Sequence, residues 1–114
     1  MAQIETLKKR RDFLAAARRR AVRQPGMLVQ ARPREDSSPT IRIGYTCSRK
    51  VGNAVTRNRA KRRLRAVAAA VLPSAARPGW DYVLIGRADS TVTRAFPQLV
   101  EDLQAALVRL HNPG

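Results

Sequence analysis

The feature that most constrains this 114-residue chain is a central segment that is apolar on one side and basic on the other. On a helical wheel, residues 57–71 divide into two stripes that lie nearly opposite each other. The apolar stripe is Ala60, Leu64, Val67 and Val71, and the polar stripe is Asn58, Lys61, Arg62 and Arg65. The pattern predicts a helix that docks on a sheet through the first stripe and presents a cationic ridge through the second.

The charge of the chain is segregated along its length. Lys and Arg number 23 against 8 Asp and Glu, which gives a net charge of +15. Residues 49–65 hold eight Lys and Arg and no acid, and residues 1–34 hold ten with two acids. Residues 66–114 hold four of each sign. Solvated faces usually mix both signs, so this segregation favours a polyanionic partner over a merely soluble surface. Arginine, which grips phosphate with two donors, dominates and favours nucleic acid.

Other classes fit the sequence poorly. No apolar run approaches the roughly 20 residues of a membrane-spanning helix, and the charged N-terminal segment does not resemble a signal peptide. Cys47 is the only cysteine, so no internal disulfide can form, and we expect it to be a buried structural thiol. These features favour a reducing cytoplasm.

Hydrophobic periodicity and turn residues predict a single domain over residues 1–114. Helices are expected over residues 7–19, 55–72 and 97–110, and strands over residues 27–31, 41–48 and 80–86. Pro73 is expected to end the middle helix. The order of elements predicts an α+β sandwich with helices against one sheet. The strand–helix–strand unit over residues 41–87 implies parallel strands, adjacent or with others between them.

The strand expected over residues 41–48 alternates strictly between two kinds of side chain. Its core face carries Ile41, Ile43, Tyr45 and Cys47, and its other face carries Arg42, Gly44, Thr46 and Ser48. Because the second face has small, hydrogen-bonding groups, we expect it to form the floor of an open cleft.

Four segments of the chain carry specific motifs. The longest is SRKVGNAVTRNRAKRRLR at 48–65, with Arg-Asn-Arg at 57–59. The others are LKKRRDF at 7–13, RIG at 42–44 and DYVLIGR at 81–87. Together they resemble the bacterial ribonuclease P protein family, whose hallmark is an Arg-Asn-Arg helix. The resemblance therefore extends over nearly the whole chain.

This resemblance implies a two-layer α/β sandwich of a four-stranded sheet and three helices, similar to the second domain of a small-subunit ribosomal protein. It also implies a left-handed βαβ crossover. The implied partners are a catalytic RNA, bound by one copy of the protein, and precursor tRNA, whose 5′ leader the complex removes. The RNA would hold the Mg²⁺ ions that carry the chemistry, so no cofactor is expected on the protein alone.

The resemblance also assigns binding residues. Those expected to contact the catalytic RNA are Arg49, Lys50, Arg57, Asn58, Arg59, Lys61, Arg62 and Arg65. Those expected to contact the leader, in a cleft between the sheet and the first helix, are Lys9, Arg10, Phe13, Arg42, Thr46 and Ser48. Phe13 either stacks on a leader base or packs in the core. Ala17 and Ala31 occupy positions where relatives often carry aromatic residues, so polar contacts are expected to outweigh stacking.

No catalytic residue or metal ligand is assigned, because the eight acids are scattered and residues 49–65 contain none. Asp81, Asp89, Glu101 and Asp102 are expected at the surface, and His111 is expected to be exposed and idle. Trp80, Tyr82 and Phe96 are expected in the core or at its rim. The chain is thus expected to be a non-catalytic subunit of an endoribonuclease. The alternatives are a small ribosomal or other structural RNA-binding protein and, third, a self-sufficient nuclease.

Overall fold

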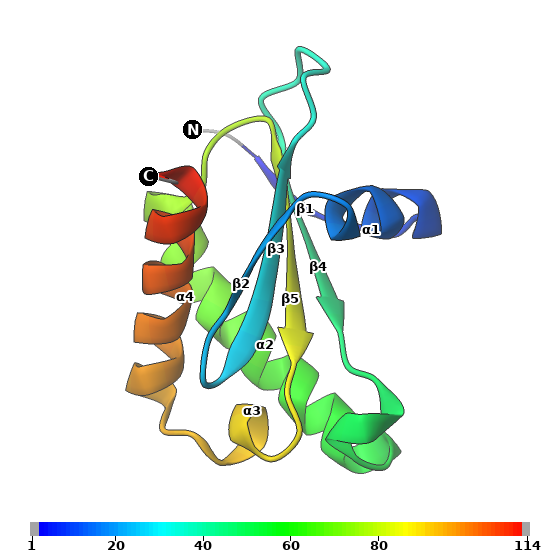
Figure 1. Ribbon diagram of the computed structural model, residues 1–114, viewed down its shortest axis with the longest axis vertical. Coiled ribbons are helices and arrows are strands. Elements are labelled where there is room, and N and C mark those ends of the chain that lie inside the picture. The colour runs from blue at the N-terminus through cyan, green and yellow to red at the C-terminus, as the bar shows by residue number, and fades with distance from the viewer. Residues whose placement is uncertain (1–2, 113–114) are drawn as a thin grey trace.

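Five strands form one mixed sheet in the computed structural model, which describes residues 3–112, in the order β1-β4-β5-β3-β2 (Figure 1). The strands are β1 (Ile4–Thr6), β2 (Arg20–Arg23), β3 (Met27–Pro33), β4 (Ile41–Thr46) and β5 (Trp80–Gly86). The helices are α1 (Arg10–Ala17), α2 (Ala54–Ala75), α3 (Ser90–Thr93) and α4 (Phe96–His111), with a 3-10 turn, η1, at Arg49–Val51. The α+β class is confirmed, with one strand more than the four expected.

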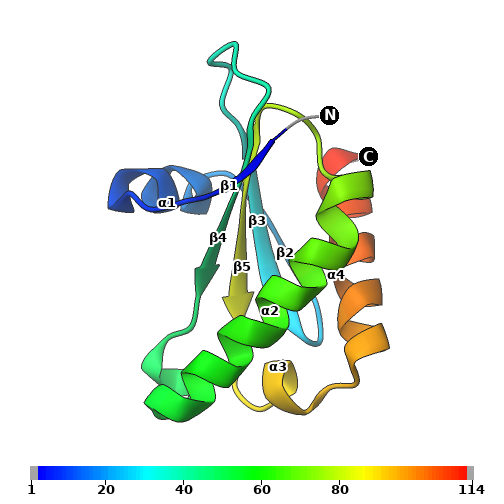
Figure 2. The ribbon, with the colours of Figure 1, turned by 180° about the vertical axis from the view of Figure 1, so that it is seen from behind.

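The connection from β4 through α2 to β5 is left-handed. β4 and β5 are parallel and hydrogen-bonded directly to each other. Figure 2 shows α2 in front of the sheet, both strands running downward, and β5 to the right of β4. A right-handed crossover in this view would place β5 on the left, so the chain adopts the rare hand that the family resemblance implied.

The main core lies between the sheet and the helices α2 and α4. Ala60, Leu64 and Val67 are fully buried and Val71 is 1% exposed, so the apolar stripe of α2 faces the sheet as predicted. The corresponding stripe of α4 also enters this core, through Leu99, Leu103, Ala106, Leu107 and Leu110. Cys47 is buried in the same core, as expected.

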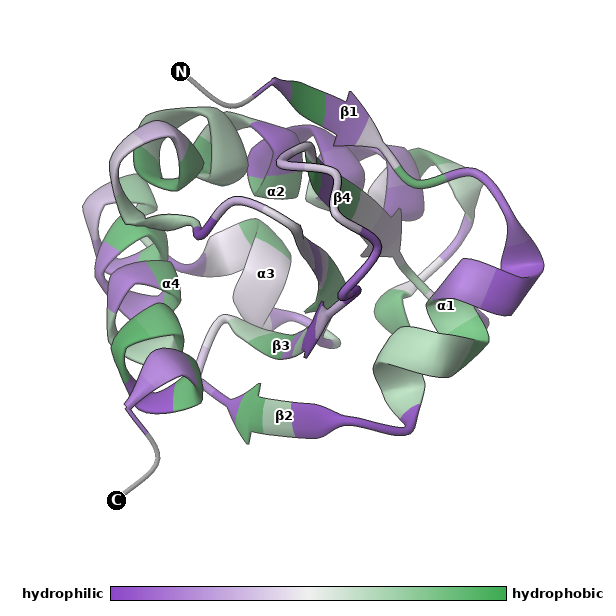
Figure 3. Cartoon of the chain, turned by 90° about the horizontal axis from the view of Figure 1, so that it is seen from above, coloured by the Kyte–Doolittle hydropathy of each residue, from purple (hydrophilic) through white to green (hydrophobic). Residues whose placement is uncertain are grey.

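Helix α1 covers part of the opposite face of the sheet, so the sandwich gains a partial third layer (Figure 3). A second, smaller apolar cluster lies beneath it, formed by Leu7, Ala16 and Val83 with Phe13 and Ile85 packed against them. The sheet therefore carries a main core on one face and a small one on the other.

Several boundaries differ from the sequence expectation, and three of them bear on the site. The first helix begins at Arg10 rather than at residue 7, because Leu7 lies in an extended segment whose N–H bonds to the carbonyl of Ile43. Strand β4 ends at Thr46 rather than at residue 48. Helix α2 runs through Pro73 to Ala75. Proline lacks the N–H that would bond to the carbonyl of residue 69, yet the helix continues for two residues beyond it.

Strands β1 and β2 were not predicted. They have three and four residues, and in β1 every side chain is exposed, so neither shows the alternation that marks a half-buried strand. Both lie at the edges of the sheet. Their positions follow from pairing with β4 and β3, which is a tertiary effect.

The aromatic residues and the histidine partly depart from expectation. Tyr82 is fully buried and Trp80 partly so, but Phe96 is 40% exposed. His111 is partly buried, with its Nε2 2.7 Å from the Tyr82 hydroxyl and its ring edge-on to Trp80. The backbone N–H of Arg77 donates to the same hydroxyl at 2.8 Å. His111 therefore anchors the end of α4 and is not idle.

Leu64→Ala should destabilise the protein by about 2–5 kcal/mol, because it opens a cavity where α2 meets the sheet. Urea unfolding followed by circular dichroism measures the change. Val55→Ala is the matched control, since Val55 lies on the same helix and is 68% exposed. Equal effects of the two substitutions would contradict the placement of α2.

Candidate RNA interface

The polar stripe of α2 forms a cationic ridge on the outer side of that helix. Asn58, Arg59, Arg62 and Arg65 are exposed, whereas Lys61, which was expected to be exposed, is partly buried, as is Arg57. No acidic residue lies between Arg42 and Asp81, so the ridge has no acidic neighbour in sequence. This surface can bind closely spaced phosphates through several guanidinium groups.

The loop before α2 extends the ridge. The Ser48 hydroxyl accepts the N–H of Lys50 at 3.3 Å, and the Asn53 side chain caps α2 by accepting the N–H of Thr56 at 2.9 Å. Gly52 between them has φ 148°, a conformation that side chains disfavour. Arg49 and Lys50 are exposed on η1, directly before the first turn of α2. The loop and the helix thus present one continuous basic surface.

Arg63, which also flanks the ridge, has a structural role. Its Nη2 donates a hydrogen bond to the carbonyl of Arg94, in the link between α3 and α4. This contact ties α2 to the start of α4.

Asp81 was expected at the surface, but it is fully buried and lies at the centre of a cluster of arginines. Its carboxylate accepts two hydrogen bonds from Arg42, both at 2.7 Å, one from Arg34 at 2.9 Å and one from Arg32 at 3.2 Å. Asp12 of α1 pairs with Arg42 at 3.3 Å and with Arg32 at 3.6 Å. We call these two acids and three arginines the Asp81 cluster.

The hydrogen bonds of the Asp81 cluster determine the ionisation of its side chains. Burial alone would raise the pKa of Asp81, but hydrogen bonds from Arg42 and Arg34 hold that pKa below its ordinary value. The hydrogen bond to Asp81 likewise raises the pKa of Arg42. Asp81 is therefore ionised at neutral pH, and Arg42, an expected leader contact, already has two carboxylate partners.

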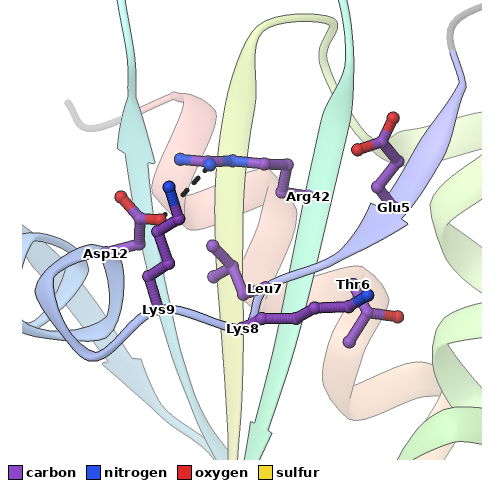
Figure 4. A pocket seen from close by; sticks show the side chains of 7 residues that line it. All are labelled: Glu5, Thr6, Leu7, Lys8, Lys9, Asp12 and Arg42. Atoms are coloured by element: carbon purple, nitrogen blue, oxygen red, sulfur yellow. Dashed lines mark hydrogen bonds and ion pairs between the residues drawn. The ribbon is translucent and has the colours of Figure 1, made fainter.

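A pocket beside the cluster opens between β1, the start of α1 and β4 (Figure 4). It has a volume of about 420 Å³. Its lining includes Lys8, Lys9 and Arg42 together with Glu5 and Asp12. The structure thus brings two of the expected leader residues, Lys9 and Arg42, into one pocket of mixed charge.

Phe13 lies directly over Gly44. A Cβ built on Gly44 would lie 2.5 Å from the Phe13 Cε1 atom, so only glycine allows this approach. The ring is half-buried and packs against the small cluster under α1. The expected open cleft floor is therefore covered by Phe13 at this point of β4.

The expected leader residues as a whole are dispersed. Lys9 and Arg10 are exposed at the start of α1, Thr46 is exposed at the far end of β4, and Ser48 belongs to the loop before α2. Arg42 and Thr46 are separated by about 13 Å along the strand. Ala31 faces the main core rather than α1, so an aromatic residue there would not lie beside Phe13.

Sequence reasoning missed the structural role of the acids. Asp102 is buried and accepts hydrogen bonds from the N–H of Gly26 at 3.0 Å and from Arg94 at 2.7 Å. The sequence held one signal for Asp81, because an acid there interrupts an otherwise apolar strand. Its register with Arg42 of β4 is visible only in the structure. Among residues 3–112 there is no group of three or more His, Cys, Asp or Glu placed to hold a metal ion.

The fold and its basic ridge define a small α+β domain of the nucleic-acid-binding class. Residues 1–111 match the family model described as Ribonuclease P. A ribonuclease P protein component from Ruegeria pomeroyi is 58% identical over 111 residues, covering 96% of this chain and 89% of that protein. One from Caulobacter vibrioides is 48% identical over 108 residues, covering 95% and 72%.

Solved structures agree with these relatives. The RNase P protein from Thermotoga maritima superposes with a TM-score of 0.74 at 27% identity, covering 91% of this chain and 96% of that one. The Staphylococcus aureus RNase P protein also gives a TM-score of 0.74, at 24% identity, covering 94% of this chain and 97% of that one, and supports the fold.

The chain therefore belongs to the ribonuclease P protein family. It is a component of a tRNA-processing endonuclease complex that contains an RNA partner. None of the helices in the described part of the chain has the length and hydropathy needed to traverse a bilayer.

Asp81→Asn should destabilise the protein by about 3–5 kcal/mol at neutral pH, because it leaves buried guanidinium charge without its counter-ion. The folded pKa of Asp81 lies below its unfolded value, so this stabilisation is complete above pH ~4 and declines as the pH falls further. Urea unfolding of both proteins between pH ~7 and ~3 measures the difference.

The exposed Asp89 provides the control, since Asp89→Asn should change stability little at any of these pH values. A difference between wild type and Asp81→Asn that is small at neutral pH, or that grows on acidification, would contradict the ion-pair assignment.

Proposed function

We propose that this chain is the RNA-binding, non-catalytic subunit of its ribonuclease P complex. The observation that carries the proposal is the exposed ridge of α2, held outward by a fully buried apolar stripe on the same helix. Its RNA-contacting residues are the loop and ridge residues Arg49, Lys50, Arg57, Asn58, Arg59, Lys61, Arg62 and Arg65. They bind phosphates in an irregular, folded part of the catalytic RNA, because a helix does not enter the narrow major groove of A-form RNA.

In this proposal the RNA carries the chemistry and holds the Mg²⁺ ions. The acids of the protein support this division, because four of the eight are already paired with arginine: Asp12, Asp36, Asp81 and Asp102. A carboxylate neutralised by arginine is a poor general base and a poor ligand for Mg²⁺. The protein then works in the cytoplasm as one copy for each RNA, stabilising the assembly by neutralising phosphates.

The substrate of the complex in this proposal is precursor tRNA, and the face of the sheet beside α1 contacts its single-stranded leader. Lys9 and Arg10 supply exposed positive charge there, and Thr46 and Ser48 supply hydrogen-bonding groups further along. Arg42 contributes mainly by positioning, since its guanidinium is bound by Asp81 and Asp12. The exposed part of the Phe13 ring also contacts the leader in this proposal.

Arg59→Ala should weaken binding of the catalytic RNA and lower the slope of log affinity against log salt by about one. The physical reason is the loss of one guanidinium that releases a counter-ion from the RNA. Filter binding over a range of salt concentrations at low Mg²⁺ measures both quantities. The defect should shrink as Mg²⁺ rises, because Mg²⁺ screens the same phosphates.

Arg109→Ala is the control, since Arg109 is exposed on α4 and is not part of the ridge. It should leave the slope unchanged. If Arg59→Ala and Arg109→Ala behave alike, the ridge is not the RNA contact.

Phe13→Ala separates leader stacking from a packing role. If the ring contacts the leader, the reconstituted complex should bind precursor tRNA more weakly, by up to the roughly 1–3 kcal/mol of one base–aromatic stack. Binding of mature tRNA, which lacks the leader, should not change. An equal loss for both RNAs, together with a lower melting temperature, would assign Phe13 to packing alone.

A further inference from the structure

A groove of which the proposed function uses only Arg65 lies between the edge strand β1 and the second half of α2. It has a volume of about 370 Å³. Its walls come from β1, β4 and α2 and include Ile4, Thr6, Tyr45, Arg65, Ala69 and Pro73. The walls are mostly apolar, and the charged residues among them are Arg65 and Glu5.

Tyr45 and Arg65 form the polar and aromatic part of this groove. The Arg65 Cζ atom lies 5.4 Å from the centroid of the Tyr45 ring, a cation–π arrangement. Tyr45 is half-buried, and it lies on the core-facing side of β4 next to the edge strand. Arg65 belongs to the cationic ridge and lies one helical turn from Lys61 and Arg62. The groove therefore opens directly onto the proposed RNA contact.

We propose that this groove receives one unpaired nucleotide of the RNA partner, with its base against the Tyr45 ring and its phosphate on Arg65. In the free protein the Arg65 guanidinium covers the ring. On binding, it moves to the phosphate and the base takes its place against the tyrosine. Aromatic rings bind splayed-out bases of any sequence in this way, because every base has a flat π face.

The shape and the charge of the groove favour a nucleotide over other occupants. Ala68 and Ala69 on the α2 wall have short side chains, which leave room for a flat group beside Tyr45. A second copy of this chain would bring two molecules of net charge +15 together. A phosphate-bearing ligand instead relieves the repulsion between Arg65, Arg62 and Lys61.

This inference rests on the proposed function, since it assumes that the ridge contacts RNA. Tyr45→Leu keeps apolar volume but removes the aromatic face, and Ala69→Leu fills the groove from an exposed helical position. Each should weaken binding of the ribonuclease P RNA by about 5- to 100-fold, and Tyr45→Leu, which removes stacking but no charge, should leave the salt slope unchanged. Tyr45→Phe and Ala70→Leu should bind as the wild type does, since Ala70 is exposed on the same helix outside the groove.

Chemical probing of the RNA bases gives the second readout. One unpaired base should be protected by the wild type, by Tyr45→Phe and by Ala70→Leu, and should become reactive with Tyr45→Leu and with Ala69→Leu. Melting temperatures verify that each variant is folded. Wild-type affinity for Tyr45→Leu and Ala69→Leu, or lost affinity with an unchanged protection pattern, would overturn the inference.

Three further outcomes are distinguishable. If sedimentation shows a wild-type dimer that Ala69→Leu abolishes, the groove is an interface between copies and the inference is wrong. If Arg59→Ala leaves RNA binding intact, the proposed function itself fails. If Arg59→Ala weakens binding and Tyr45→Leu does not, only the groove assignment fails.

Discussion

One buried carboxylate holds together the part of the structure that faces α1. Asp81 at the start of β5 binds Arg32 of β3, Arg34 of the loop that follows β3, and Arg42 of β4. Asp12 of α1 binds two of these arginines, Arg32 and Arg42. A buried pair costs desolvation energy, which is recovered only when every oxygen is hydrogen-bonded, as those of Asp81 are. The cluster fixes where α1 sits on the sheet. It also neutralises the charge of Arg42. The basic residues of this chain therefore differ in how much of their charge is available to bind RNA.

Helix α2 carries the basic residues that are proposed to contact RNA. Its apolar stripe is fully buried, so its rotation about its own axis is fixed and the basic side chains must face outward. Because α2 lies on the face opposite to α1, the ridge and the surface beside α1 are separate regions of one small protein (Figure 3). The loop that carries Arg49 and Lys50 connects the end of β4 directly to the start of α2.

Much of this could be predicted from the sequence where a long periodic pattern existed. The 3.6-residue stripes of α2 and α4 and the alternation in β4 gave the right elements, within a few residues. Strands β1 and β2 were not predictable, because three or four mostly exposed residues carry no period. The burial of Asp81 was missed because its partners, 39 to 49 residues away in sequence, become neighbours only through the strand order. Conversely, the exposure of Asn58, Arg62 and Arg65 was predicted correctly, because helical spacing places them opposite the buried apolar stripe, whereas Lys61 is partly buried.

In the proposed function the protein supplies binding and charge to the complex, and no chemical group. The most direct test is the single-turnover rate of precursor tRNA cleavage by the reconstituted complex, with protein and Mg²⁺ both saturating. Under these conditions Arg59→Ala should cleave at nearly the wild-type rate, and the protein without RNA should not cleave at all. A large loss of rate that persists at saturation would contradict the account, because it would place the ridge at the catalytic centre.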